Sequence, residues 1–116
     1  MSAFPFSFPS GRVAAGLFLL AGLAGAPAQA RDAQAGQAKA QTCAVCHGPV
    51  GISLTPDAPN LAGQPAIYVA AQLRAYRSGA RKHEVMAVLA RALTDQDIDN
   101  LAAWYASIRI EAQPPR

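Results

Sequence analysis

The sequence predicts a small all-α domain, and three observations support this. The chain has 116 residues, which is room for one domain, because domains typically contain about 100 to 200 residues. Hydrophobic residues make up 52% of the chain and charged residues 15%, a balance that excludes an intrinsically disordered chain. Apolar residues recur at helical spacing towards the C-terminus, and no segment shows the alternation typical of a strand. We therefore expect about four helices and no sheet.

The first thirty residues predict an export signal. Arg12 provides the positive flank, and residues 13–26 form an uncharged run of fourteen. Ala-Gln-Ala at residues 28–30 then gives the small-x-small pattern that signal peptidases accept. Fourteen apolar residues are too few to cross a membrane, which takes about 20, and an uncleaved anchor is the alternative. We expect cleavage after Ala30, so that residues 1–30 are a secretory signal peptide and residues 31–116 are the mature domain.

A helix followed by a long loop is expected at the start of the mature domain. Asp32 is a suitable N-cap for a helix that runs to about His47. Residues 48–64 are rich in glycine and proline, which favours a loop. A long ordered loop in a small domain is usually functional.

Three further helices are expected after the loop. Pro65 at a first helical position and Gly79 just past the end bracket one of them, and a short helix is expected over residues 85–93. Thr94 followed by Asp97 is a capping signature for the last helix. Five apolar residues of that helix recur at helical spacing, namely Ile98, Leu101, Ala102, Tyr105 and Ile108.

The mature domain is poor in large core residues. Its 86 residues include 19 Ala but only 16 Leu, Ile and Val. A domain of this size usually needs a disulfide, a metal or a cofactor for stability. Its nine basic residues (ten less Arg12) against seven acidic ones leave a charge of +2, which is too slight to indicate nucleic-acid binding.

Both cysteines lie in a Cys-x-x-Cys-His run at residues 43–47, and four interpretations compete for it. A thioredoxin-type redox pair expects a strand–helix–strand setting, whereas the flanks here are helical. A zinc site would need His47 and His83 with both cysteines, and adjacent Cys46 and His47 are awkward as simultaneous ligands. A disulfide would close too small a loop to stabilise the chain much. The favoured interpretation is covalent haem c.

The reason for this preference is geometric. On one helical turn, Cys43 and Cys46 can each add to one of the two haem vinyl groups, and His47 then lies beneath the iron as an axial ligand. An exported chain reaches a compartment where haem c is attached. One covalently held haem would also replace the apolar bulk that the chain lacks, and the fold would then depend on the cofactor.

A second axial ligand is needed if the iron is to pass electrons rather than bind gases or peroxide. In the mature domain Met86 is the only methionine, and His83 is the only histidine besides His47. A neutral thioether disfavours the extra charge of ferric iron and raises the reduction potential. We therefore expect Met86 as the metal ligand, with a gap-filling role in the core as its alternative. His83 lies in a polar run that is more typical of a solvated turn, and it stays open as the other candidate ligand.

Four segments carry motifs of one known family. They are Cys43-Ala44-Val45-Cys46-His47-Gly48, Pro59–Gln64, Gln72-Leu73 with Gly79, and Leu93–Ala106. Together they resemble the class I cytochromes c, particularly the bacterial cytochrome c553 and single-domain cytochrome c4 group. The resemblance covers nearly all of residues 31–112, and its haem motif is highly specific.

The resemblance implies a cytochrome c fold, with helices wrapped around one haem. In that fold the first and last helices cross through small residues, here Gly36 or its alanine neighbours against residues 104–105. It also implies that the Pro59 carbonyl accepts the second imidazole hydrogen of His47, which fixes the orientation of the ring. Relatives often have a proline beside the ligand methionine, and Met86 has none, which keeps the alternative ligand open.

These features lead us to expect a periplasmic monohaem electron carrier that is not an enzyme. The partners would be redox proteins that donate or accept one electron in transient complexes, with no nucleic acid and no stable membrane span after cleavage. Four basic residues at near-helical spacing could steer an acidic partner, namely Arg74, Arg77, Arg81 and Lys82. An ordinary solvated surface is the alternative, and one of the arginines could instead neutralise a haem propionate. Two other functions stay open: a haem subunit bound to a larger periplasmic oxidoreductase, and a haem sensor or peroxidase-like protein with an open iron site.

Overall fold

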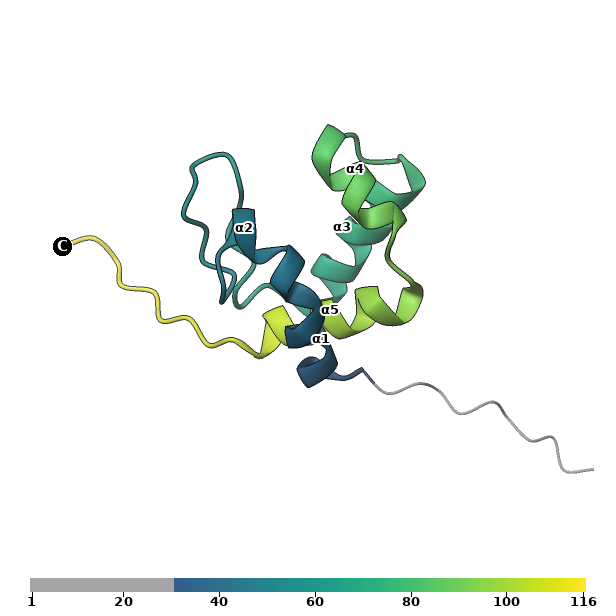
Figure 1. Ribbon diagram of the computed structural model, residues 1–116. Helices are drawn as coiled ribbons and strands as arrows, with labels where there is room; N and C mark the ends of the chain where they lie inside the picture. Colours follow the sequence, from purple (N-terminus) through teal and green to yellow (C-terminus); the bar gives the residue numbers. More distant parts are fainter. Residues whose placement is uncertain (1–30) are drawn as a thin grey trace, which may run out of the picture.

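The computed structural model describes residues 31–116, which are helical and contain no strand (Figure 1). The predicted signal peptide, residues 1–30, lies outside the described residues. The expected all-α class is confirmed for the part that is described. The elements in chain order are α1 (Ala33–Lys39), the 3₁₀ turn η1 (Ala40–Thr42), α2 (Ala44–His47), α3 (Ala66–Ser78), α4 (Glu84–Arg91) and α5 (Asp95–Ser107).

The first helix is divided into three pieces, where the sequence predicted one helix from Asp32 to His47. Asp32 caps α1 as predicted, because its carboxylate accepts hydrogen bonds from two backbone amides of the first turn, at 2.8 and 3.1 Å. The chain tightens into η1 where the Thr42 hydroxyl donates to the Lys39 carbonyl at 3.2 Å. Such side-chain bonds compete with regular helix geometry. Helix α2 follows as a separate turn that carries His47.

Helices α3 and α4 lie within two residues of their predicted bounds, which is the usual uncertainty of helix ends. Helix α5 begins as predicted but ends at Ser107, so Ile108, which was expected inside the helix, is its extended C-cap. Pro65 is the N-cap of α3 rather than its first residue. Gly79 ends α3 at a φ of 82°, as a left-handed cap. The capping box of α5 is present as predicted, because Thr94 and Asp97 each accept a hydrogen bond from the backbone N–H of the other.

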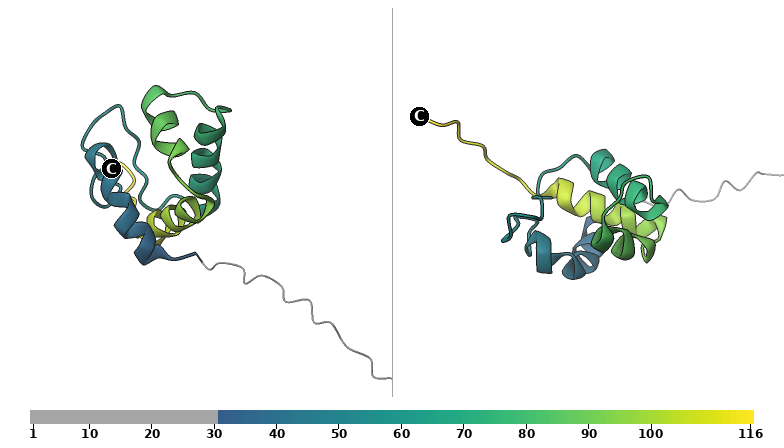
Figure 2. Two further views of the ribbon diagram at one scale, coloured as in Figure 1. Left: turned by 45° about the vertical axis from the view of Figure 1, so that its right-hand side comes forward. Right: turned by 90° about the horizontal axis from the view of Figure 1, so that it is seen from above.

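Helices α1 and α5 cross with their backbones in contact at Gly36 (Figure 2). A Cβ atom at Gly36 would lie 2.0 Å from the carbonyl oxygen of Asn100 and 2.9 Å from the Cβ of Trp104. Only glycine fits so close an approach. The expected crossing at Trp104 is confirmed, and its closest point lies one turn earlier, at Asn100. The amide oxygen of Asn100 also accepts the backbone N–H of Asp32 at 2.9 Å.

The hydrophobic core lies between α5, α3 and the turn η1. Its buried members are Ala40, Val69, Ala70, Ile98, Leu101, Ala102 and Tyr105. Among the described residues only Ile98 and Leu101 are both large and fully buried. This agrees with the composition, which predicted that the polypeptide alone builds a small core.

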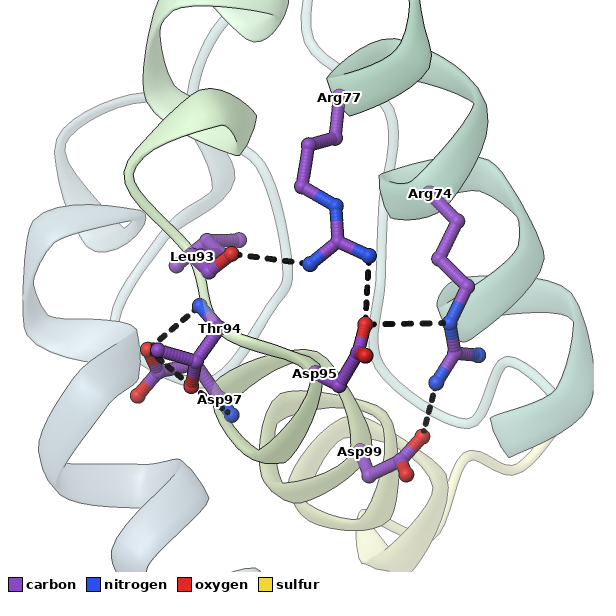
Figure 3. Close-up of polar contacts among 7 residues, drawn as sticks. All are labelled: Arg74, Arg77, Leu93, Thr94, Asp95, Asp97 and Asp99. Atoms are coloured by element: carbon purple, nitrogen blue, oxygen red, sulfur yellow. Dashed lines mark hydrogen bonds and ion pairs between the residues drawn. The ribbon is translucent and has the colours of Figure 1, made fainter.

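Ion pairs fasten α3 to the start of α5 (Figure 3). Arg74 lies 2.8 Å from the carboxylate of Asp99, and Arg77 lies 2.5 Å from that of Asp95. Arg77 also donates to the Leu93 carbonyl at 3.0 Å. Within residues 31–116 no helix is long and apolar enough to cross a membrane.

Candidate haem-binding site

A cavity of about 760 Å³ opens on one side of the helical core. Ligand pockets in proteins typically measure about 300 to 1,000 Å³. Residues 43–64, here called the His47 wall, line one side, and residues 65–93, here called the Met86 wall, line the other. Figure 1 shows the two walls facing each other, with α2 and its loop opposite α3 and α4. Leu101 and Tyr105 of α5 complete the lining.

The Cys-x-x-Cys-His run forms a single turn at this cavity. Cys43 precedes α2 as its N-cap, and the backbone N–H of His47 donates to the Cys43 carbonyl at 3.0 Å. Cys43, Cys46 and His47 all line the cavity. Both thiols are free, with Cys43 half-buried and Cys46 exposed. The structure therefore brings the three residues of the motif to one surface, and it does not contain the disulfide that was one alternative.

The His47 ring is held in one orientation by the loop. His47 is only 7% exposed, and its Nδ1 lies 2.8 Å from the carbonyl oxygen of Pro59. A carbonyl oxygen only accepts hydrogen bonds, so Nδ1 carries the hydrogen and donates it. Nε2 is then left with a free lone pair, which is the arrangement found in histidines that bind metals. The hydrogen bond that the resemblance implied between His47 and Pro59 is confirmed.

Backbone hydrogen bonds fix the loop that carries Pro59. The Gly51 carbonyl accepts the N–H groups of Leu61 at 2.7 Å and of Ala62 at 3.0 Å. Gly51 has a φ of 75°, and a Cβ atom there would lie 2.8 Å from the Ala62 nitrogen and 2.9 Å from the Tyr105 ring. The loop can close over His47 only with glycine at this position.

Ser53 is a positioning residue that the sequence did not reveal. Its Oγ lies 2.9 Å from the carbonyl oxygen of Cys46 and 2.8 Å from that of Thr55. Its backbone N–H donates to the Asn60 side chain at 2.7 Å. Ser53 thus links the turn of the Cys-x-x-Cys-His run to the part of the loop that carries Pro59. A single serine inside a loop matches no pattern, so no sequence signal could have found it.

Met86 lies in α4 and lines the cavity from the opposite side to His47. Three apolar neighbours in α4, Val85, Val88 and Leu89, line the same cavity and are 54%, 64% and 43% exposed. Large apolar side chains clustered and uncovered in this way mark a surface that binds an apolar partner. A flat apolar group between the two walls would cover them.

His83, the other candidate ligand, lies at the start of α4. It is the N-cap of that helix, and its Nδ1 accepts the backbone N–H of Met86 at 3.3 Å. The side chain is exposed, although it touches the cavity lining. Its ring also stands edge-on to the ring of Tyr76, with 6.3 Å between the centroids.

Tyr105 closes the inner end of the cavity beside Cys43. It is 2% exposed, and its hydroxyl has no hydrogen-bond partner among the described residues. Burial, with the nearby Cys43 thiol, raises the pKa of Tyr105 well above its ordinary value, so the hydroxyl stays a neutral donor. Buried hydroxyls without a partner are uncommon, and this one lies where a cofactor joined to Cys43 would be attached.

The residues around the cavity fit a covalently held haem. They provide two thiols on one turn, an imidazole with a free Nε2, apolar walls and a thioether on the far side. The alternatives fit less well. Residues 31–116 hold no group of three or more His, Cys, Asp or Glu side chains that could bind a metal ion such as zinc. They also contain no strand for a thioredoxin-like setting.

The basic face expected from the sequence is smaller than predicted. Arg74 and Arg77 point to α5 and are paired with Asp95 and Asp99 (Figure 3). The hydrogen bond from Arg77 lowers the pKa of Asp95, and the charges of both arginines add to the effect. Arg74 and Arg77 lie one helical turn apart on α3, where they face acidic residues of the same chain, whereas Arg81 and Lys82 lie beyond the end of that helix.

The comparisons with known proteins agree with this site. Residues 33–109 match the family model described as cytochrome c. The chain is 46% identical over 81 residues to cytochrome c-554(548) of Halomonas halodenitrificans, which covers 67% of this chain and 98% of that protein. It is 44% identical over 91 residues to cytochrome c4 of Pseudomonas aeruginosa, which covers 78% of this chain and 45% of that protein.

The fold is similar to that of a solved relative. The crystal structure of reduced recombinant cytochrome c4 from Pseudomonas stutzeri matches with a TM-score of 0.65 and 37% identity, over 69% of this chain and 47% of that one. The chain thus spans nearly the whole of the Halomonas protein and about half the length of these cytochromes c4.

Proposed function

Because the chain belongs to the cytochrome c family, we propose that it is a one-electron carrier with one haem c between the His47 wall and the Met86 wall. A cytochrome c domain implies haem that is covalently bound. Bound haem supplies a couple between ferric and ferrous iron. The observation that carries the proposal is the hydrogen bond between His47 and Pro59, which leaves Nε2 free at a cavity that two thiols also line.

Each residue of the Cys-x-x-Cys-His run has a separate role in this proposal. Cys43 and Cys46 would form the two thioether bonds, and His47 would bind the iron through Nε2. The Pro59 carbonyl keeps the His47 ring from turning and makes it a stronger electron donor. A ligand that cannot turn stays in place in both oxidation states, which suits fast electron transfer.

Met86 is the proposed second ligand, through its thioether sulfur. It lines the cavity on the side opposite to His47, and the apolar wall of α4 surrounds it. The position of His83 supports this choice, because its Nδ1 already accepts the Met86 N–H. A neutral imidazole with Nδ1 as acceptor carries its hydrogen on Nε2 and has no free lone pair for iron.

With His47 and Met86 both holding the haem, the site would need no open position for a substrate. We therefore propose that the chain transforms no substrate itself and exchanges electrons with redox proteins in transient complexes. We also propose that residues 1–30 direct export and are removed after Ala30, which places the domain in the periplasm. Stable co-purification with a flavin or molybdenum protein would instead identify a bound subunit of a larger oxidoreductase.

The experiment that tests the carrier function uses the exported protein purified from the periplasm. We expect haem bands that stay with the polypeptide after acid–acetone extraction, and a redox titration that fits one reversible one-electron step. Mass spectrometry of the same sample should show one haem and an N-terminus at Arg31. Haem that leaves with the solvent, or a protein without haem, would overturn the proposal.

A further inference from the structure

We propose that His83 is the positioning residue for Met86: by capping α4 through the Met86 N–H, it fixes where that helix begins and so where the methionine side chain enters the cavity. The proposal rests on the proposed function, in which Met86 binds the iron. It assigns His83 a role that excludes its being the ligand.

The cap geometry joins the two residues directly. His83 has extended backbone angles, φ −167° and ψ 124°, as N-cap residues do. Met86 is the third residue of α4, and its backbone N–H is one of the groups at a helix start that have no partner within the helix. The His83 Nδ1 accepts this N–H at 3.3 Å. One hydrogen bond therefore both caps the first turn of α4 and holds the backbone of Met86.

Helix α4 is expected to depend on its N-cap more than the longer helices α3 and α5 do. It has eight residues, which is short for a helix that must hold its own shape. Among the described helices it makes its extensive contacts with α3, whereas α5 packs on both α1 and α3. Ala90 is its only buried residue. A helix held from one side is free to fray at its start, and Met86 lies in that first turn.

His83 is itself held against α3. The His83 ring stands edge-on to the Tyr76 ring, with 6.3 Å between the centroids. The guanidinium of Arg81 lies over the face of the Tyr76 ring, 4.7 Å from its centroid. Arg81 is fixed in turn by its backbone N–H, which donates to the Ala75 carbonyl at 3.0 Å, and by its side chain, which donates to Gln72 at 2.6 Å. Contacts with α3 thus hold the turn between α3 and α4 in place. His83 lies in this turn and accepts the Met86 N–H, so it links α3 to the first turn of α4.

The test compares three variants of the haem-loaded protein. His83→Ala removes the cap, whereas His83→Asn removes the imidazole but keeps a side chain that caps well. Lys82→Ala is the matched control, because Lys82 is the exposed neighbour of His83 and lies outside the cavity lining. The readouts are the weak far-red band of an iron–methionine bond in the oxidised protein, the reduction potential and the hydrogen exchange of the Met86 amide.

We expect His83→Ala to speed exchange of the Met86 amide by about fivefold, the loss of a typical N-cap, with a weaker far-red band and a lower potential. His83→Asn should restore the band and keep exchange within about twofold of the wild type, and Lys82→Ala should change nothing. The proposal is overturned if His83→Ala leaves the band and the exchange rate unchanged, or if His83→Asn does not rescue them. A wild-type protein with covalent haem and no far-red band would overturn the ligand role of Met86 and leave covalent haem c standing.

Discussion

The two walls of the cavity are built differently. The His47 wall is held by the backbone, through the carbonyl of Pro59, the paired amides on Gly51 and the cross-links of Ser53. The Met86 wall carries its methionine on one short helix, α4, which packs on α3 and begins at a side-chain cap. His47, one proposed iron ligand, is therefore fixed by several independent contacts, whereas Met86, the other, is fixed by few. We expect changes on the His47 wall to affect folding, and changes on the Met86 wall to affect the iron.

The largest effect is expected from removing the thiols of the His47 wall. The double change Cys43→Ser and Cys46→Ser should abolish covalent haem, because no thioether can form. The apolar wall of α4 would then stay uncovered, and we expect little folded protein in the periplasm. Haem staining of a denaturing gel and a circular dichroism melt of any recovered protein would check this. A variant that keeps haem through acid–acetone extraction would contradict it.

Two glycines with similar backbone angles give the next largest contrast. Gly51 on the His47 wall has a φ of 75° and is crowded by Ala62 and Tyr105, whereas Gly79 before α4 has a φ of 82° and open space around it. Gly51→Ala should cost about 3 kcal/mol, from the left-handed backbone and the overlap together. Gly79→Ala should cost about 1 kcal/mol, from the backbone alone.

Denaturant unfolding of the two glycine variants, both loaded with haem, measures this difference. Equal losses of stability would show that the His47 wall is no more constrained than the Met86 wall. The far-red band should survive in both, because neither glycine contacts Met86.

Ser53→Ala removes a side-chain contact to the backbone from the His47 wall, as His83→Ala does from the Met86 wall. We expect it to lower the free energy of unfolding by about 1 kcal/mol and to leave the far-red band unchanged, since the Pro59 carbonyl and the Gly51 bonds still hold His47. Chemical denaturation and the oxidised visible spectrum are the measurements. A band as weak as that of His83→Ala would mean that the two walls respond alike.

The smallest effect is expected from acid, at the start of α5. The hydrogen bond from the Thr94 backbone lowers the pKa of Asp97, and the Thr94 hydroxyl and Lys39 add to the shift. A carboxyl whose pKa is lower in the folded state stabilises that state above its unfolded pKa of about 3.9. The contribution is lost as the pH falls through the lower folded value.

Asp97→Asn tests this pH dependence. It should make the free energy of unfolding less sensitive to pH between about pH 4 and pH 2, and melts across that range would measure the slope. A slope identical to that of the wild type would show that Asp97 adds nothing in acid.

The sequence predicted the parts of the fold that depend on local chemistry. Asp32, Gly79 and Thr94 mark helix ends by their own side chains or backbone freedom, and the structure has them there. The spacing of residues 43–47 was enough to place three site residues on one turn. Patterns of this kind need only a few neighbouring residues, which is why they can be read from the sequence.

The parts that failed depend on contacts that no sequence pattern marks. Arg74 and Arg77 looked like a free basic face, because nothing in their helix shows that Asp95 and Asp99 lie opposite. Ser53 could not be found because its partners lie on two other segments. The break of the first helix near Thr42 was also missed, and the Thr42 hydroxyl there donates to the Lys39 carbonyl.

We propose that His47 and Met86 together hold one haem between two unlike walls. The most direct measurement is the visible spectrum of the oxidised protein and its Met86→Ala variant, each reduced afterwards under carbon monoxide. We predict a far-red band and no carbon monoxide binding in the wild type. Met86→Ala should lose the band, bind carbon monoxide and keep its covalent haem. A band that survives Met86→Ala, or a wild-type protein that binds carbon monoxide readily, would contradict the claim.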